Sequence, residues 1–227
     1  MAVAPAMFCF ALPEALSFEQ GAGLILNYHT AYFALALRGR LAAGETVLVH
    51  GAGGGVGTAT LQVAKGLGAQ TIAIVSSDAK EEIARRAGAD HVLRSDGRWR
   101  EQAQEITDGG VDVAVDPVGG ERFLDSLRSL REGGRLVVIG FTAGEIPQLR
   151  VNRLLLKNIE VVGAGWGEYM RTDPRRMATV AAALEPLIEA GHVSPIVGGS
   201  YPLEAAGEAL AALEGREAVG KVVLTVG

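Results

Sequence analysis

The sequence predicts a doubly wound α/β fold, in which helices cover both faces of a parallel sheet. Short runs rich in Val and Ile alternate with amphipathic stretches along most of the 227 residues. Most of these runs are continuously apolar, which is typical of strands buried on both faces of a parallel sheet. The chain is 48% hydrophobic with 31 glycines and only 5% aromatic residues, so we expect a core of small aliphatic side chains.

The predicted strands and helices follow one another in strict alternation. The strands are expected at residues 45–51, 70–76, 89–93, 111–119, 134–141 and 158–165. The helices between them are expected at residues 58–68, 78–87, 98–106, 120–131 and 147–157. This order predicts the six-stranded parallel sheet of a Rossmann fold.

The two ends of the chain do not fit into this sheet. A helix over 174–190 is followed by the stretch VSPIVGGSYPL, a helix over 203–214 and a final strand GKVVLTV. These pieces add two strands that a six-stranded sheet does not need, and residues 1–20 are also left over. Both ends therefore indicate parts of a second lobe.

Composition and charge exclude several classes of function. The formal net charge is −5 and no basic stripe is visible, so the sequence predicts no nucleic-acid partner. The only cysteine, Cys9, can build neither a disulfide framework nor a CxxC zinc site. No basic segment precedes an apolar one at the N-terminus, and no run of 18 apolar residues exists. We therefore expect no signal peptide, no membrane span and a cytoplasmic protein.

A glycine-rich turn follows the first strand, in the sequence VLVHGAGGGVGTATLQVAKGLGA. Glycines at this place let backbone N–H groups approach a pyrophosphate, and the N-terminus of the next helix adds partial positive charge. The literal pattern GxGxxG is replaced by AxGxxG, but the turn lies between a strand and a helix of a βαβ unit, which predicts a dinucleotide site. The predicted contact residues are Gly54, Gly55, Val56 and Gly57.

The end of the second strand indicates which dinucleotide is held. NAD sites usually carry an Asp or Glu here, which accepts hydrogen bonds from the ribose 2′-OH. This chain has Ser76 and Ser77 instead, and Asp78 is better explained as the N-cap of the next helix. Without the acid, the two hydroxyls, the helix N-terminus and Lys80 can hold a 2′-phosphate, which favours NADPH over NADH. The alternative is that SSD is only a capping turn and Lys80 a solvated side chain.

Several motifs together resemble a known family. They are LILNYHTAYFAL, GETVLVHGAGGGVGTATLQVAKGLGA and VDVAVDPVGGERFLDSLRSLREGGRLVVIG. The combination is similar to the zinc-independent quinone oxidoreductases, the zeta-crystallin-like branch of the medium-chain dehydrogenase/reductase superfamily. Members of this branch begin with a GroES-like catalytic lobe, most of which is missing from this chain.

The resemblance implies a division of the chain and a mode of association. Residues 1–22 would be the end of the catalytic lobe, with AVAPAMFCFALP similar to its last strand, residues 23–190 the dinucleotide-binding domain, and residues 191–227 the returning part of the lobe. Family members pair through the sheet edge that contains GRLVVIGF and NIEVVGAG. An apolar edge strand without Lys or Pro favours such pairing, so a homodimer is expected.

The stretch LNYHTAY carries further implications of the resemblance. It implies that Thr30 lies near the nicotinamide and that Asn27 faces the same pocket. Tyr28 is a second substrate-pocket candidate, although amphipathic helix packing explains it equally well. Zinc-dependent relatives have a ligand Cys where this chain has Leu26, so no zinc is expected. His29 is better explained as an ordinary pocket or helix residue than as a metal ligand, because it has no partner ligands.

Later turns complete the predicted cofactor site. The resemblance places the adenosine side of the cofactor against DPVGG, at Val118 and Gly119, and the nicotinamide carboxamide against the backbone of Gly140 and Phe141. Asp116 is interpreted as a turn or helix-capping carboxylate. The aromatic residues after the sixth strand, Trp166 and Tyr169, could equally contact the cofactor or a partner subunit.

These features predict an NADPH-dependent, zinc-independent oxidoreductase that transfers hydride to a quinone or an α,β-unsaturated carbonyl compound. The cofactor supplies the reactivity, and a conjugated acceptor suits a site without a metal to polarise a carbonyl. No general acid can be named, because the resemblance places the family's proton donors in the missing lobe. The alternatives are an enoyl-thioester reductase and a nucleotide-binding module without turnover.

Overall fold

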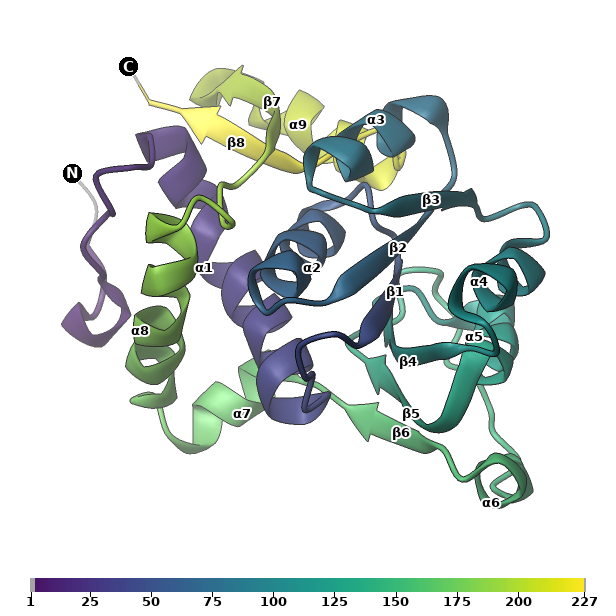
Figure 1. The fold of residues 1–227 in the computed structure, drawn as a ribbon. Coiled ribbons are helices and arrows are strands. Elements are labelled where there is room, and N and C mark those ends of the chain that lie inside the picture. Colours follow the sequence, from purple (N-terminus) through teal and green to yellow (C-terminus); the bar gives the residue numbers. More distant parts are fainter. Residues whose placement is uncertain (1–2, 227) are drawn as a thin grey trace.

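The computed structural model describes residues 3–226 and has a six-stranded parallel sheet in the order β3-β2-β1-β4-β5-β6 (Figure 1). This arrangement confirms the predicted fold class, because the chain reverses its direction of growth between β3 and β4 as a Rossmann sheet does. The strands are β1 (Thr46–His50), β2 (Gln70–Val75), β3 (His91–Arg94), β4 (Val111–Asp116), β5 (Leu130–Val138) and β6 (Glu160–Gly163).

Helices cover both faces of the sheet (Figure 1). One face is closed by α1, α2 and α8, and its core includes Val49, Leu61 and Leu184. The other face is closed by α4 and α5, with Leu48 and Leu127 in a second core cluster. The helices are α1 (Phe18–Tyr32), α2 (Gly55–Gly66), α3 (Asp78–Arg86), α4 (Trp99–Thr107), α5 (Phe123–Ser129), α6 (Asn152–Lys157), α7 (Trp166–Thr172), α8 (Arg176–Glu189) and α9 (Ala206–Glu214).

Some elements differ from the sequence-based expectation. The helix expected at 147–157 is confined to α6, and the helix expected at 120–131 is split into η3 (Gly120–Arg122) and α5. Helix α1 was not among the helices expected between the strands, although helix packing was one interpretation of Tyr28. It begins with a capping box in which Ser17 and Gln20 satisfy each other's backbone N–H groups. The helix continues as η2 (Phe33–Arg38), a π-helical stretch.

The C-terminal segments form a small unit outside the six-stranded sheet. Strands β7 (Val197–Pro202) and β8 (Lys221–Thr225) pair in parallel as their own two-stranded sheet, which packs against α1 and α9. Between them lie η4 (Leu203–Ala205) and α9. The backbone N–H of Gly220 donates to Gly53 O at 2.8 Å, so this unit reaches the glycine turn.

The N-terminal segment does not form the strand that was expected there. Within residues 3–13 the only regular element is η1 (Ala6–Phe8), a single 3-10 turn, and most of the segment is exposed. A strand needs a neighbour for its backbone hydrogen bonds, and no described strand lies beside this segment. The predicted domain boundary at residue 22 falls inside α1, whereas the boundary at 190 coincides with the end of α8.

Candidate functional site

The glycine turn between β1 and α2 contains glycines of two kinds. A Cβ atom on Gly57 would lie 2.2 Å from Gly51 O, so only glycine lets the helix pack this closely on the strand. A Cβ atom on Gly54 would meet nothing nearer than Gly51 O at 3.4 Å. Packing within the protein therefore explains Gly57 but does not require Gly54. The space beside Gly54 is open for a ligand.

Residues of α1 lie behind this turn. A Cβ atom on Gly55 would be 2.5 Å from Asn27 Nδ2, so the buried Asn27 side chain rests on the turn. Tyr28 is also buried, and its hydroxyl donates to Gln62 Oε1 at 2.7 Å, while burial raises its pKa. Tyr28 therefore belongs to the packing between α1 and α2 and does not line a cavity. The Thr30 hydroxyl donates to Leu26 O of its own helix at 2.7 Å.

A cleft of about 370 Å³ opens at the carboxyl ends of β1, β2 and β4. The structure brings together there seven of the predicted site residues: Gly54, Gly55, Val56, Gly57, Ser76, Lys80 and Val118. The remaining candidates do not line the cleft: Asn27, Tyr28, Thr30, Ser77, Gly119, Gly140 and Phe141. The cleft is therefore lined by the glycine turn and by residues at the end of β2 and the start of α3.

The end of β2 corrects one detail of the prediction. The N-cap of α3 is Ser77, whose Oγ accepts from Lys80 N at 3.4 Å. Asp78 is the first helical residue and forms an ion pair with Arg94 at 2.9 Å. Ser76 and Lys80 remain available, and the Lys80 ammonium donates to Ser76 Oγ at 3.3 Å. A hydroxyl and an ammonium group thus lie side by side at the rim of the cleft.

The turn after β4 is held by a carboxylate. Asp116 Oδ1 accepts hydrogen bonds from the backbone N–H groups of Val118 at 2.8 Å and Gly119 at 2.9 Å. This confirms the interpretation of Asp116 as a turn carboxylate. Gly119 has φ of 69°, and a Cβ atom there would lie 2.9 Å from the Phe141 ring. Phe141 therefore packs beside this turn, outside the cleft.

Two arginines of the cleft were missed in the sequence. Arg122 of η3 and Arg216 of the loop after α9 both line it, and Arg216 donates to Thr142 O at 3.1 Å across the opening. With Lys80, they give the cleft three cationic side chains. Within the described part of the chain, none of the lining residues carries a carboxylate. This charge distribution fits a ligand with several phosphate groups.

The aromatic residues after β6 are part of the core. Trp166 is 4% exposed and packs at 5.5 Å from Phe33, which stacks on Tyr169 at 4.5 Å. His29 lies edge-on between Phe10 and Trp166, and burial lowers its pKa to about 4. Neither aromatic residue lines the cleft.

The described residues contain no evident metal site. Over residues 3–226, no group of three or more His, Cys, Asp or Glu side chains could hold an ion. Leu26, at the position where zinc-dependent relatives have a ligand, is an exposed side chain without a donor atom, and His29 beside it has aromatic neighbours. The residues present thus do not fit a zinc centre.

Over residues 3–226, no helix is both long and apolar enough to cross a membrane.

A glycine turn at the carboxyl edge of a Rossmann sheet, next to a cationic cleft, defines a dinucleotide-binding protein. The sequence profile of the family described as zinc-binding dehydrogenase matches residues 55–185. The chain belongs to this family, in the quinone oxidoreductase branch of the medium-chain dehydrogenase/reductase superfamily. The resemblance found in the sequence is thereby confirmed.

Individual relatives agree with this assignment. Quinone oxidoreductase-like protein 2 of Bos taurus is 38% identical over 95% of this chain and 62% of its own length. The quinone oxidoreductase of Thermus thermophilus, solved also in complex with NADPH, is 34% identical with a TM-score of 0.81, over 95% of this chain and 69% of that one. The CurK enoyl reductase is 27% identical with a TM-score of 0.86, over 99% and 67%. The chain thus spans about 62% of the curated relative's length.

Proposed function

We propose that the chain is the cofactor-binding part of an NADPH-dependent oxidoreductase that reduces a quinone or an α,β-unsaturated carbonyl compound without zinc. The observation that supports this most directly is the cleft at the glycine turn, which has three cationic side chains and no carboxylate among its described lining residues. A ribose 2′-phosphate is repelled by the acid that NAD sites usually carry, and that acid is replaced here by Ser76. The NADPH complex of the Thermus relative is consistent with this cofactor.

Each part of the cleft has a role in holding the cofactor. The backbone of Gly54, Gly55 and Val56, at the N-terminus of α2, would bind the pyrophosphate. Lys80 and Ser76 would bind the 2′-phosphate through charge-assisted hydrogen bonds. The turn at Val118, held by Asp116, would contact the adenosine. NADPH, when bound, supplies the hydride that reduces the acceptor.

The position of the nicotinamide end of the cofactor is also a proposal. We place the nicotinamide near Gly140, Phe141, Thr30 and Asn27, next to the catalytic lobe of which residues 1–22 and 191–227 would form part. Asn27 supports this placement because it rests on Gly55, at the inner end of the glycine turn. A cytoplasmic location is likewise proposed.

An enoyl-thioester reductase is the second candidate, and the CurK enoyl reductase supports it. A third is a nucleotide-binding module without turnover. One assay separates them: the purified chain is mixed with NADPH and a panel of quinones, enones and enoyl thioesters, and loss of NADPH absorbance is followed. Turnover of quinones or enones supports the proposal, and turnover restricted to thioesters supports the second candidate. Binding without turnover supports the third, and stoichiometric zinc in the sample would contradict zinc independence.

Lys80→Ala is expected to weaken NADPH binding more than NADH binding. The variant removes one charge-assisted contact to the 2′-phosphate, which NADH lacks, so the loss should be about 1–2 kcal/mol for NADPH alone. Titration calorimetry with both cofactors measures the difference. Lys65→Ala is the matched control, because Lys65 pairs with Asp90 away from the cleft. Equal losses for NADPH and NADH would contradict the assignment of Lys80.

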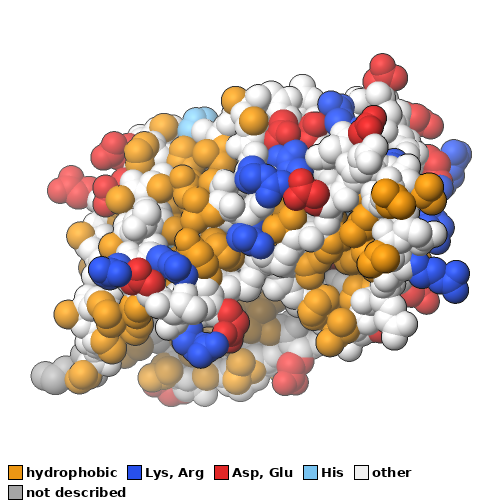
Figure 2. Space-filling view, turned by 90° about the horizontal axis from the view of Figure 1, so that it is seen from below, with side chains coloured by type: hydrophobic (Ala, Val, Ile, Leu, Met, Phe, Trp, Pro, Cys, Tyr) orange, Lys and Arg blue, Asp and Glu red, His pale blue; other side chains and the backbone are white. Residues whose placement is uncertain are grey.

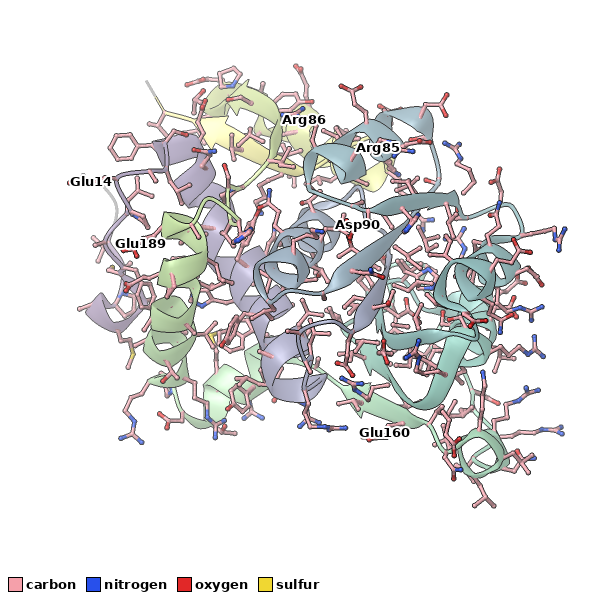
Figure 3. All side chains as sticks on the ribbon, viewed as in Figure 1. Glu14, Arg85, Arg86, Asp90, Glu160 and Glu189 are labelled. Atoms are coloured by element: carbon pink, nitrogen blue, oxygen red, sulfur yellow. The ribbon has the colours of Figure 1, made fainter. Side chains whose placement is uncertain are left out.

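The protein is expected to form a homodimer through β6, the outer strand of the sheet, on which Glu160 lies (Figure 3). The strand contains one charged residue, and exposed apolar side chains of α6, Leu155 and Leu156, precede it. The surface seen from below also carries broad groups of apolar side chains (Figure 2). Such an edge favours strand pairing between two copies.

Light scattering at low micromolar concentration should therefore report about twice the chain mass. Val161 is half-buried against the core, so Val161→Lys would disturb packing as well as association. Gly163→Lys is the cleaner variant, because a Cβ atom there meets nothing within 4 Å. It should shift the protein toward monomer without loss of stability. A wild-type protein that is strictly monomeric would refute the pairing.

A further inference from the structure

A buried histidine lies beneath the cleft and has no role in the proposed cofactor contacts. His50 is the last residue of β1 and is 1% exposed. Val49 pairs with Val115 in the register of β1 and β4, so His50 and Asp116 are neighbours across the two strands and point to the same face. Asp116 is also 1% exposed. The pair therefore lies directly under the turn at Val118.

The hydrogen bonds around His50 favour one of its two neutral tautomers. His50 Nε2 is 2.8 Å from Ser126 Oγ, and Ser126 Oγ donates to Arg122 O at 2.9 Å. A serine hydroxyl has a single proton, which the carbonyl takes because a carbonyl can only accept. With the hydroxyl proton directed to Arg122 O, the contact to the imidazole runs in the other direction, with His50 Nε2–H donating to Ser126. His50 Nδ1 is the unprotonated nitrogen, and it is buried without a hydrogen-bond partner among the described residues.

The surroundings keep the imidazole neutral. Burial lowers the pKa of His50, and the nearby Arg122 guanidinium lowers it further, while Asp116 raises it. The Trp99 ring packs edge-on against the imidazole at 5.0 Å between centroids, so water is excluded from that side. A neutral ring with one N–H group can keep the contact to Ser126 at ordinary pH, whereas a second proton would have to be placed in a buried environment.

His50 has neighbours in two parts of the rim of the cleft, one reached by hydrogen bonds and one by strand pairing. Ser126 holds the carbonyl of Arg122, whose side chain lines the cleft. Asp116, beside His50, holds the turn at Val118 through its Oδ1 atom. His50 is thus a hydrogen-bond partner of the helix that follows Arg122 and a neighbour of the carboxylate that holds the turn at Val118.

We propose that His50 is a positioning residue for the cofactor cleft: as the Nε2–H tautomer it holds Ser126, and through Ser126 it fixes Arg122 where it can contact a phosphate of the dinucleotide. This inference rests on the proposed NADPH site. It assigns no chemical step to His50. His50 affects cofactor affinity, and its proposed tautomer predicts which side chains can replace the imidazole.

Two substitutions distinguish the two ring nitrogens. The amide nitrogen of Gln reaches the position of His Nε2, whereas that of Asn lies near Nδ1. His50→Gln should therefore bind NADPH within about twofold of wild type, and His50→Asn should bind about tenfold more weakly, a difference of about 1.4 kcal/mol. Ser126→Ala should weaken NADPH binding as much as His50→Asn does. The double variant that combines these two substitutions should lose little more NADPH affinity than either single variant. Titration calorimetry measures all four.

A spectroscopic measurement tests the tautomer without any variant. In a ¹⁵N-histidine NMR spectrum of the wild-type chain, His50 should show a protonated Nε2 and an unprotonated Nδ1. A protonated Nδ1, or an Asn variant that binds as well as the Gln variant, would overturn the proposal. If wild-type protein bound no NADPH, the proposed function would fail separately. In that case the NMR signal of the Arg122 Nε–H group would test whether His50 positions Arg122. The signal should keep its wild-type position in His50→Gln and shift in His50→Asn. The same position in both variants would refute the positioning role.

Discussion

Gly54→Val is expected to abolish NADPH binding while the protein stays folded. The backbone at Gly54 is extended, with φ of −93°, so valine can adopt it, and a Cβ atom there meets only Gly51 O at 3.4 Å. The two methyl groups would occupy the open space of the cleft in which the pyrophosphate must approach the backbone. Affinity should fall more than about 100-fold, or about 2.7 kcal/mol. Titration calorimetry and circular dichroism measure binding and fold together.

Substitutions at two other glycines serve as comparisons for Gly54→Val. Gly207→Val is the matched control, because a Cβ atom on Gly207 in α9 meets nothing within 4 Å and Gly207 does not line the cleft. This variant should bind NADPH as wild type does. Gly57→Ala should instead lose the fold, since its Cβ atom would overlap Gly51 O. Unchanged NADPH affinity in Gly54→Val would move the phosphate site away from the glycine turn.

The fold was predictable because its strands are buried on both faces. Val47, Leu48 and Val49 are all fully buried, so β1 appears in the sequence as an unbroken apolar run. Helix α1 was harder to predict: Leu26 on it is 62% exposed while the polar Asn27 beside it is buried, so its pattern does not follow an ordinary amphipathic helix. The expected N-terminal strand failed because a strand depends on neighbours that a local sequence pattern does not reveal.

The candidate site was predictable where it depends on local motifs. Gly54 belongs to a glycine turn and Lys80 to the first turn of the helix after β2, two places whose sequence indicates dinucleotide binding, and both residues line the cleft. Arg122 and Arg216 were missed because no local pattern marks them. Arg216 belongs to the C-terminal unit, which is hydrogen-bonded to the glycine turn through Gly220 and lies far from that turn in sequence. Such contacts between distant segments are set by the fold and are absent from any short stretch of sequence.

Arg135→Met is expected to cause a large loss of stability, with no direct effect on the cofactor cleft. The Arg135 guanidinium is almost fully buried and donates to both carboxylate oxygens of Glu45, at 2.7 and 2.8 Å, and to Gly39 O at 2.8 Å. These contacts connect β5, which contains Arg135, to the segment 39–45 before β1. Removing it leaves Glu45 without its counter-ion and a carbonyl without its donor, which should cost about 3 kcal/mol of unfolding free energy. Urea unfolding at pH 7 measures the loss.

The loss in Arg135→Met should also depend on pH in a defined direction. The hydrogen bond from Arg135 lowers the pKa of Glu45 below its value in the unfolded chain. The pair therefore stabilises the fold fully at pH values above the pKa of an ordinary Glu, and this stabilisation is lost as the pH falls through the lowered pKa of Glu45. The gap between wild type and variant should therefore narrow below about pH 4. Arg171→Met is the matched control, because its pair with Glu168 is exposed and should contribute less than about 0.5 kcal/mol. Equal losses in the two variants at pH 7 would show that burial of the Arg135 pair contributes nothing to stability.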